Sequence, residues 1–206
     1  MSKKTFADFG LVKPLVKAAA AEQYHKATPI QEAAIPKIIM GRDILGVAQT
    51  GTGKTAAFAM PILHRISKEK RPMNSRTPRV LVLSPTRELA TQISDRFMAY
   101  GKKMNLRLIT VFGGVNQNPQ VKALRKGVHV LVATPGRLID LINQGHVELD
   151  RLEFFVLDEA DRMLDMGFIP DIERIFKLTP FTRQTLFFSA TMPPEITRLT
   201  QEFLHN

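Results

Sequence analysis

The chain has 206 residues, of which 44% are hydrophobic, and this is enough for one domain with a core of ordinary size. It contains no cysteine, which excludes disulfides and thiolate metal sites, and its apolar stretches fall far short of the roughly 20 residues that a membrane helix needs. With 29 Lys and Arg against 19 Asp and Glu, the net charge of +10 favours a polyanionic partner such as nucleic acid, although many basic proteins bind nothing specific. The N-terminus does not resemble a secretory signal, so we expect a cytoplasmic protein.

Short β-rich runs alternate with helical stretches along the chain. In chain order, strands are predicted at 43–47, 79–84, 106–112, 129–133, 154–158 and 185–189. Runs such as VLVLS and FFVLD are apolar at every position, which is typical of parallel strands covered by helices on both faces. We therefore predict a single α/β domain over residues 1–206 with an open, mostly parallel sheet, and ligands at the carboxyl ends of its strands.

The first predicted strand is followed by the sequence AQTGTGKT and then by a helix-forming run. This matches the phosphate-loop pattern except that alanine replaces its first glycine. In such loops the backbone N–H groups surround phosphates, Lys54 would reach the β- and γ-phosphates, and the Thr55 hydroxyl would ligate Mg²⁺. The alternative without a function is a glycine-rich turn with a chance lysine, and the strand-loop-helix context disfavours it. The nucleotide-binding residues predicted here are Ala48, Gln49, Thr50, Gly51, Thr52, Gly53, Lys54 and Thr55.

The predicted strand 154–158 ends in two adjacent carboxylates, Asp158 and Glu159. Successive side chains at a strand end point in different directions, so the two have different predicted roles. Asp158 would hold Mg²⁺, directly or through water, while Glu159 orients and deprotonates an attacking water. Acidic residues at strand ends also serve as helix caps, and alone this pair would favour function only weakly. Together with Lys54 of the phosphate loop, it predicts half of a hydrolytic site.

Residues 158–161 read DEAD, and together with further short motifs in the same order they resemble the DEAD-box RNA helicase family over nearly the whole chain. The resemblance implies the first, ATP-binding RecA-like domain of such a helicase, with a core at about 35–206. ATP and Mg²⁺ are the implied cofactors, and RNA is the implied partner.

The segment YHKATPIQ, in a region of about 6–31, resembles the adenine-reading Q motif of that family. The resemblance implies that the Gln31 amide bonds the adenine edge, that Thr28 supports it, and that Phe6 stacks near the base. Tyr24 is the fourth implied nucleotide contact. Two positions depart from the usual pattern and remove no contacting side chain: Gln23 stands where glycine is usual, and Ala27 where proline is common.

Three more segments follow predicted strands: PTRELA at 85–90, a glycine pair, and TPGR at 134–137. In the family these segments contact the RNA backbone, and hydroxyls, arginines and backbone N–H groups suit phosphate oxygens without reading bases. Taken singly, PTRELA would be a helix start capped by Thr86, and TPGR an ordinary turn. The implied RNA-binding residues are Pro85, Thr86, Arg87, Gly113, Gly114, Thr134, Pro135, Gly136 and Arg137.

The triplet SAT follows the last predicted strand. The resemblance implies that the hydroxyls of this triplet bond the acidic motif, and that Asp161, Ser189, Ala190 and Thr191 couple hydrolysis to RNA unwinding. A second RecA-like domain supplies arginines to the γ-phosphate in the family. No such motif follows here, so we expect these 206 residues to bind nucleotide but to be nearly inactive alone. The basic segment 68–79 and the pair at 102–103 are expected to be solvated surface.

Three functions follow from these features. The first is a helicase domain that separates short RNA duplexes or remodels RNA–protein complexes. The second is a nucleotide-gated clamp or scaffold that holds RNA and protein partners without separating strands. The third is a DNA-directed relative, which the Q motif and the DEAD tetrad disfavour.

Overall fold

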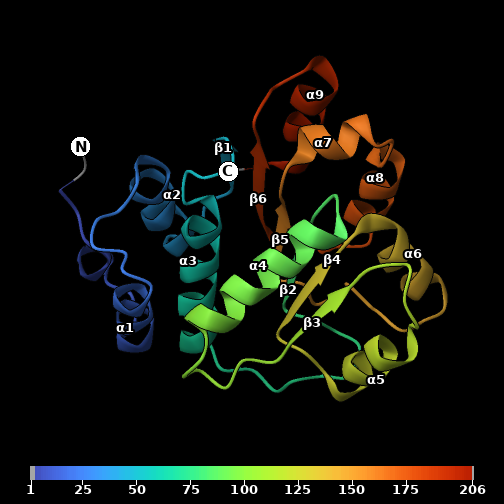
Figure 1. Cartoon of the computed structure of the whole chain (residues 1–206). Helices are drawn as coiled ribbons and strands as arrows, with labels where there is room; N and C mark the ends of the chain where they lie inside the picture. The colour runs from blue at the N-terminus through green and yellow to red at the C-terminus, as the bar shows by residue number, and fades with distance from the viewer. Residues whose placement is uncertain (1–2, 206) are drawn as a thin grey trace.

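The computed structural model describes residues 3–205; Met1, Ser2 and Asn206, which the single-domain prediction includes, lie outside the described residues. A six-stranded sheet with the order β1-β6-β5-β2-β4-β3 runs through the molecule, and helices cover both of its faces (Figure 1). Every strand pair is parallel, so the predicted α/β fold with an open parallel sheet is confirmed.

All six predicted strands are present, with ends that lie within two residues of the prediction. Their bounds are β1 (Ile44–Val47), β2 (Val80–Leu83), β3 (Leu108–Val111), β4 (Val130–Ala133), β5 (Phe154–Leu157) and β6 (Gln184–Ser189). The four central strands are buried along their whole length, as their apolar runs predict. Strands β1 and β3 are partly exposed because they form the two edges of the sheet.

The helices divide into two layers. One layer holds the short helix η1 (Phe6–Phe9) with α1 (Lys13–Ala21), α2 (Pro29–Ile39), α3 (Lys54–Lys68) and α4 (Arg87–Tyr100). The other layer holds α5 (Asn118–Lys126), α6 (Pro135–Asn143), α7 (Ala160–Asp165), α8 (Ile169–Lys177) and α9 (Pro194–Phe203). Alternate residues of each strand face the two layers: Val82 packs into the first core and Leu83 into the second. None of the helices in residues 3–205 is long and apolar enough to cross a membrane.

The two departures from the Q-motif pattern have visible backbone consequences. Gln23 adopts a left-handed conformation with φ 62°, which glycine enters more readily than a residue with a Cβ. The backbone N–H of Ala27 donates to the carbonyl of Lys4 at 2.9 Å, a bond that proline has no N–H to form. The chain therefore ties its N-terminal segment to the start of α2 through a residue where proline is common in the family.

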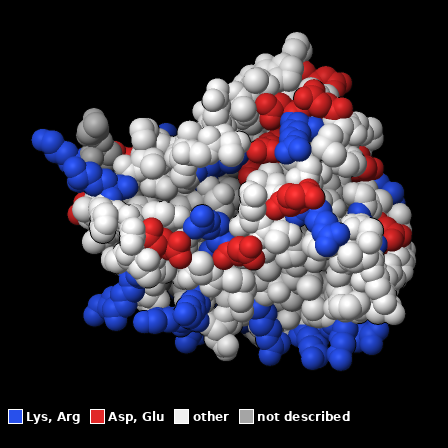
Figure 2. Space-filling model, viewed as in Figure 1, with Lys and Arg blue, Asp and Glu red and all other residues white. Residues whose placement is uncertain are grey.

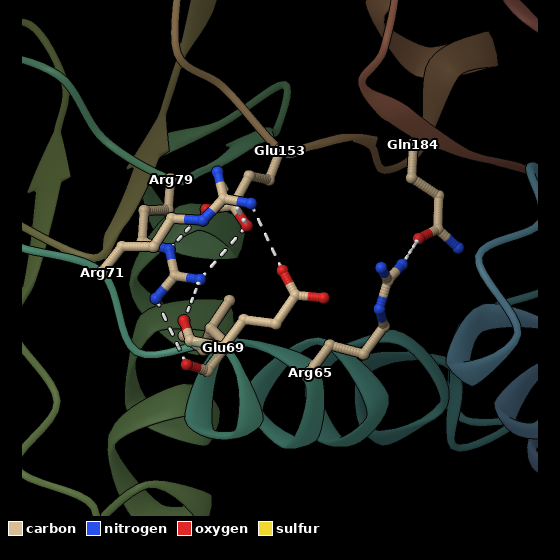
Figure 3. Close-up of polar contacts among 7 residues, drawn as sticks. Arg65, Glu69, Arg71, Arg79, Glu153 and Gln184 are labelled. Atoms are coloured by element: carbon tan, nitrogen blue, oxygen red, sulfur yellow. Dashed lines mark hydrogen bonds and ion pairs between the residues drawn. The ribbon is translucent and has the colours of Figure 1, made fainter.

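A polar cluster at the amino end of the sheet corrects one sequence expectation (Figure 3). Arg79, which was expected on a solvated loop, is buried because it lies directly before β2 and its guanidinium turns back under α3. The guanidinium pairs with Glu153 and donates to the carbonyls of Ile66 and Glu69 at 3.2 and 2.7 Å. Nearby, Arg65 donates to the side chain of Gln184. Residues 69–78 of this basic segment connect α3 to β2 without regular structure.

Candidate functional site

The predicted phosphate loop leaves β1 at the carboxyl edge of the sheet and runs into α3. Gly53, the residue before α3, has φ 79°, and a Cβ there would collide with the Gln31 side chain. Within the loop, the Thr52 hydroxyl donates to the carbonyl of Gln49 at 2.7 Å, and the N–H of Ala48 donates to Ser189 at 3.2 Å. The loop is therefore held by its own bonds, by the Q-motif region and by the residue that ends β6.

Gln31 links the Q-motif region to the phosphate loop. Its Nε2 donates to the carbonyl of Gly53 at 3.0 Å, and its Oε1 accepts from the N–H of Thr28 at 2.9 Å. The side chain is 3% exposed. Contact between Gln31 and an adenine edge stays a prediction, for which the amide has a second N–H and a second lone pair beyond these two bonds. The buried Thr28 hydroxyl has no hydrogen-bond partner among the described residues, so it is available to a ligand or a water.

The aromatic residues predicted to lie near the base pack against one another. Phe6 is 2% exposed, and its ring lies 5.8 Å from Phe9 and 5.9 Å from Tyr24. The Tyr24 hydroxyl lies 3.0 Å from that of Tyr100, and burial together with this bond raises the pKa of Tyr100. Stacking of Phe6 on a base stays a prediction, and it requires the ring to present one face outside this packing.

The carboxylate that ends β5 meets the lysine of the phosphate loop. Lys54 Nζ lies 2.7 Å from Asp158 Oδ1, and both side chains are buried. Burial raises the pKa of Asp158, an effect that the charge and hydrogen bond of Lys54 partly oppose. The second oxygen, Oδ2, has no hydrogen-bond partner in residues 3–205. An unsatisfied carboxylate oxygen beside a phosphate loop, with the Thr55 hydroxyl at the start of α3, fits a hard cation such as Mg²⁺ or its bound water.

Glu159 reaches the phosphate loop from a strained backbone. Its φ and ψ are 54° and 52°, in the left-handed region that residues with a Cβ rarely enter. The Thr50 hydroxyl donates to Glu159 Oε1 at 3.4 Å, and Arg162 donates to Oε2 at 3.5 Å. The strained turn thus directs the Glu159 side chain toward the loop, while the adjacent Asp158 stays buried beside Lys54.

The triplet after β6 bonds the last residue of the DEAD tetrad. Asp161 Oδ2 accepts from the N–H and the hydroxyl of Thr191 at 3.0 and 2.8 Å. The N–H of Asp161 donates to the Ser189 hydroxyl at 3.2 Å, while Ala190 between them is exposed. Partial burial alone would raise the pKa of Asp161, but the hydrogen bonds from Thr191 lower it overall. The contact is present, and its coupling role stays a prediction.

A hollow of about 400 Å³ lies at the carboxyl ends of β2, β3 and β4. It is named here the RNA groove because residues predicted to bind RNA line it. It brings together residues predicted to bind RNA from all three segments: Pro85, Thr86, Arg87, Gly113, Thr134, Gly136 and Arg137. The two other predicted residues, Gly114 and Pro135, adjoin these in sequence but do not line the hollow. Sequence reasoning did not assign three apolar lining residues to this site: Phe112, which directly precedes Gly113, and Met166 and Phe168, which lie between α7 and α8.

Two arginines of the RNA groove are held in place by the protein. The Arg87 guanidinium lies 4.6 Å from the centre of the Phe112 ring. Arg137 donates to Gln120 Oε1 at 3.1 Å and to the carbonyl of Val115 at 3.0 Å. Thr86 does cap α4, because its hydroxyl accepts from a backbone N–H of the first turn at 3.2 Å. TPGR begins α6 and is not an isolated turn.

A parallel α/β sheet with a phosphate loop after its first strand, and an acidic strand end beside that loop, defines the class of nucleoside triphosphate-binding domains. Within this class, the chain belongs to the DEAD/DEAH box helicase family, whose model matches residues 28–199.

Comparison with known proteins gives the same assignment. The chain is 48% identical to the ATP-dependent RNA helicase CshA of Limosilactobacillus reuteri, over 97% of the chain and 39% of that protein. It is 46% identical to the ATP-dependent RNA helicase DeaD of Klebsiella pneumoniae, over 97% of the chain and 30% of that protein. A crystal structure of a DEAD box protein from Methanococcus jannaschii superposes with a TM-score of 0.90 at 36% identity, covering 100% of this chain and 55% of the other. The chain thus spans well under half the length of these curated relatives.

Proposed function

We propose that this chain is the ATP-binding domain of an ATP-dependent RNA helicase that separates short duplexes or remodels RNA–protein complexes. The observation that carries the proposal is the contact of Lys54 with Asp158 at 2.7 Å, beside the Glu159 carboxylate that bonds the phosphate loop at Thr50. Adenine specificity is proposed for Gln31 with Thr28, Phe6 and Tyr24, and the amide can both donate to and accept from the base.

In the proposed reaction each site residue has a separate task. The backbone N–H groups of residues 50–55 and the Lys54 ammonium hold the phosphates. Glu159 takes a proton from water as the water oxygen attacks the γ-phosphorus and the bond to the β–γ bridging oxygen breaks, which leaves ADP and phosphate. Asp158 must release Lys54 to the phosphates, and burial of its carboxylate favours a new cationic partner.

Mg²⁺ is the proposed cofactor, held by the Thr55 hydroxyl and by Asp158 directly or through water. When bound, it would neutralise charge on the β- and γ-phosphate oxygens. The unsatisfied Oδ2 of Asp158 supports this assignment. Residues 3–205 contain no cluster of three His, Cys, Asp or Glu side chains that could hold a metal alone, so nucleotide and metal are proposed to bind together.

RNA is the proposed polyanionic partner, and the RNA groove is its proposed site. Hydroxyls, arginines and helix N-termini line the groove, and such groups contact phosphates without reading sequence. We further propose a cytoplasmic location and a second RecA-like domain in the longer protein, which supplies arginines to the γ-phosphate. The much greater length of the relatives supports that domain.

Nucleotide binding tests the proposal on these 206 residues. Titration calorimetry with ADP or a non-hydrolysable ATP analogue should give Mg²⁺-dependent binding, weaker binding of guanine nucleotides, and little RNA-stimulated hydrolysis. Replacing Gln31 with Ala should reduce the preference for adenine, while Glu32→Ala, one residue along α2, serves as the matched control. Equal affinity for adenine and guanine nucleotides in the unaltered chain would rule out adenine reading.

The longer protein tests the chemistry and distinguishes the three functions. Glu159→Gln should abolish turnover while ATP binding persists, and undiminished turnover would remove Glu159 from its assigned role. Strand separation is then compared with RNA-stimulated hydrolysis. Hydrolysis and RNA retention without separation would favour the clamp, and stronger stimulation by DNA than by RNA would favour the DNA-directed relative.

A further inference from the structure

The positive charge of the chain is concentrated along one edge of the sheet. Between Asp95 and Asp140 the sequence contains no Asp or Glu, although Lys and Arg recur throughout this segment. The segment includes the end of α4, the edge strand β3, and all of α5 and β4. In Figure 2, Lys and Arg gather along the lower edge of the molecule, below α4 and α5 as labelled in Figure 1, and no Asp or Glu is visible there.

Six exposed cations of this segment form what we name the basic flank: Lys102, Lys103, Arg107, Lys122, Arg125 and Lys126. The first two follow α4, the third precedes β3, and the last three lie on α5, which packs beside β3. None of the six forms an ion pair with any residue in 3–205. Helix-dipole stabilisation explains cations in the last turn of α5, such as Lys126, but not Arg107 or Lys122.

Other arginines at the amino end of the sheet, unlike the basic flank, have polar partners within the protein. A hollow of about 910 Å³ there is lined by Arg65, Arg79 and Arg183 among other residues. Arg79 pairs with Glu153, and Arg65 donates to Gln184 (Figure 3). Arg183 donates to two backbone carbonyls at 3.1 and 3.2 Å. These guanidinium groups form contacts within the fold, whereas the exposed side chains of the basic flank can contact solvent or a partner.

The helix α5 connects the basic flank to the RNA groove. Gln120, in its first turn, donates to the carbonyl of Phe112 at 3.2 Å and accepts from Arg137 at 3.1 Å. Both of these partners line the RNA groove. The helix has nine residues and is therefore about 13 Å long, so Lys126 at its end lies within a few nucleotides of the groove.

We propose that the basic flank is a second phosphate-binding surface, which holds the part of an RNA that extends beyond the RNA groove. The inference rests on the proposed function and adds an RNA path along α5 toward the amino end of β3. It replaces the expectation that the lysines at 102–103 are only solvated surface. Lysine and arginine without interleaved aromatic residues contact the backbone and not the bases, so binding there is independent of sequence.

Salt-dependent RNA binding tests the inference on the 206-residue chain. Fluorescence anisotropy compares a short RNA of about 5 nucleotides, confined to the groove, with one of about 20 nucleotides. The variant K122Q/R125Q/K126Q should lower the slope of log affinity against log salt by about 2 for the long RNA, since each single-strand phosphate contact contributes about 0.7. A fourfold rise in salt would then weaken wild-type binding about 16-fold more than variant binding. Binding of the short RNA should be unchanged.

The matched control K17Q/K37Q/K177Q removes the same charge from exposed sites elsewhere, two of which also lie in the last turn of a helix. An equal loss in control and flank variants would reduce the effect to net charge and overturn the inference. If K122Q/R125Q/K126Q fails to fold by circular dichroism, K102Q/K103Q in the turn after α4 provides the test. This variant should lower the slope by about 1.4, so a fourfold rise in salt would weaken wild-type binding about 7-fold more than variant binding.

The two levels of proposal fail in different ways. One result would overturn only the basic flank: Arg87→Gln weakens binding of the short RNA, but the flank variants leave binding of the long RNA unchanged. This result would point to an acidic protein as an alternative partner of the flank. Absence of RNA binding by the unaltered chain, at low salt and with nucleotide, would overturn the proposed RNA function itself.

Discussion

At the scale of single residues, the backbone conformation of Glu159 separates two adjacent carboxylates. Asp158 ends a buried strand, whereas Glu159 takes φ 54° and reaches Thr50 of the phosphate loop. A left-handed residue with a Cβ costs on the order of 1 kcal/mol, and such strain persists where the surrounding structure enforces it. The conformation of Glu159 therefore lowers stability somewhat but places its carboxylate beside the phosphate loop.

Glu159→Gly should increase the free energy of unfolding by on the order of 0.5–1 kcal/mol, because glycine enters this region without strain. Glu159→Gln keeps the Cβ and should leave stability nearly unchanged, so it is the matched control. Urea denaturation followed by circular dichroism measures both. If Glu159→Gly is less stable than Glu159→Gln, the result would contradict backbone strain at this position.

At the scale of elements, the N-terminal helices are attached to the domain through a neutral histidine. The N–H of Val12, the residue before α1, donates to Nδ1 of His64 in α3 at 3.1 Å. Burial lowers the pKa of His64, and the nearby charges of Lys68 and Arg65 lower it further. Because the lone pair of Nδ1 accepts this bond, protonation there would break it.

Attachment of α1 should therefore weaken in acid. A histidine whose folded pKa lies below its unfolded value of 6.5 contributes stability that is present above 6.5 and is lost as the pH falls through the folded pKa. Protection factors of α1 amides from hydrogen exchange should decrease from pH 7.5 toward pH 5.5. In His64→Gln this decrease should be absent, while the pH response near His129, whose pKa burial also lowers, should remain. A pH-independent α1 in the wild type would contradict the assignment.

At the scale of the whole molecule, the candidate site and a buried ion pair lie at opposite ends of the strands. The phosphate loop, the acidic residues and the RNA groove lie at the carboxyl ends of the strands. The amino ends hold the Arg79–Glu153 pair, in which both side chains are largely buried. Substitutions in this ion pair should thus change stability and leave nucleotide binding unchanged.

Glu153→Ala should lower the free energy of unfolding by on the order of 3 kcal/mol, because it leaves the buried Arg79 guanidinium without its carboxylate. Glu69→Ala is the control: in the described part of the chain its carboxylate pairs only with the exposed Arg71, so a change within about 0.5 kcal/mol is expected. Nucleotide affinity, measured well below the unfolding temperature, should be unchanged in both. A loss of affinity in folded Glu153→Ala would contradict the separation of the two ends.

Much of this arrangement could be predicted from sequence, for local reasons. The apolar runs placed all six strands, and strand-loop patterns placed Lys54, Asp158 and Thr134 at one edge of the sheet. Features that depend on residues distant in the sequence could not be predicted from local patterns. Arg79 is buried because Glu153, far along the chain, neutralises it. The link from Gln31 to Gly53 likewise exists only because the folded chain brings the two segments together.

The strand order also fixes how far apart the two proposed ligands lie. From β1, which leads into the phosphate loop, to β4, which leads into TPGR, the sheet makes four inter-strand steps of about 4.8 Å, or about 19 Å in all. Three strands, β6, β5 and β2, lie between them. The residues that follow β5 and β2 are Asp158 and Ser84, and both are buried with a side-chain oxygen that lacks a hydrogen-bond partner among the described residues. The direct connection between the two proposed sites within the sheet therefore runs across neighbouring strand ends, whose residues are widely separated along the chain.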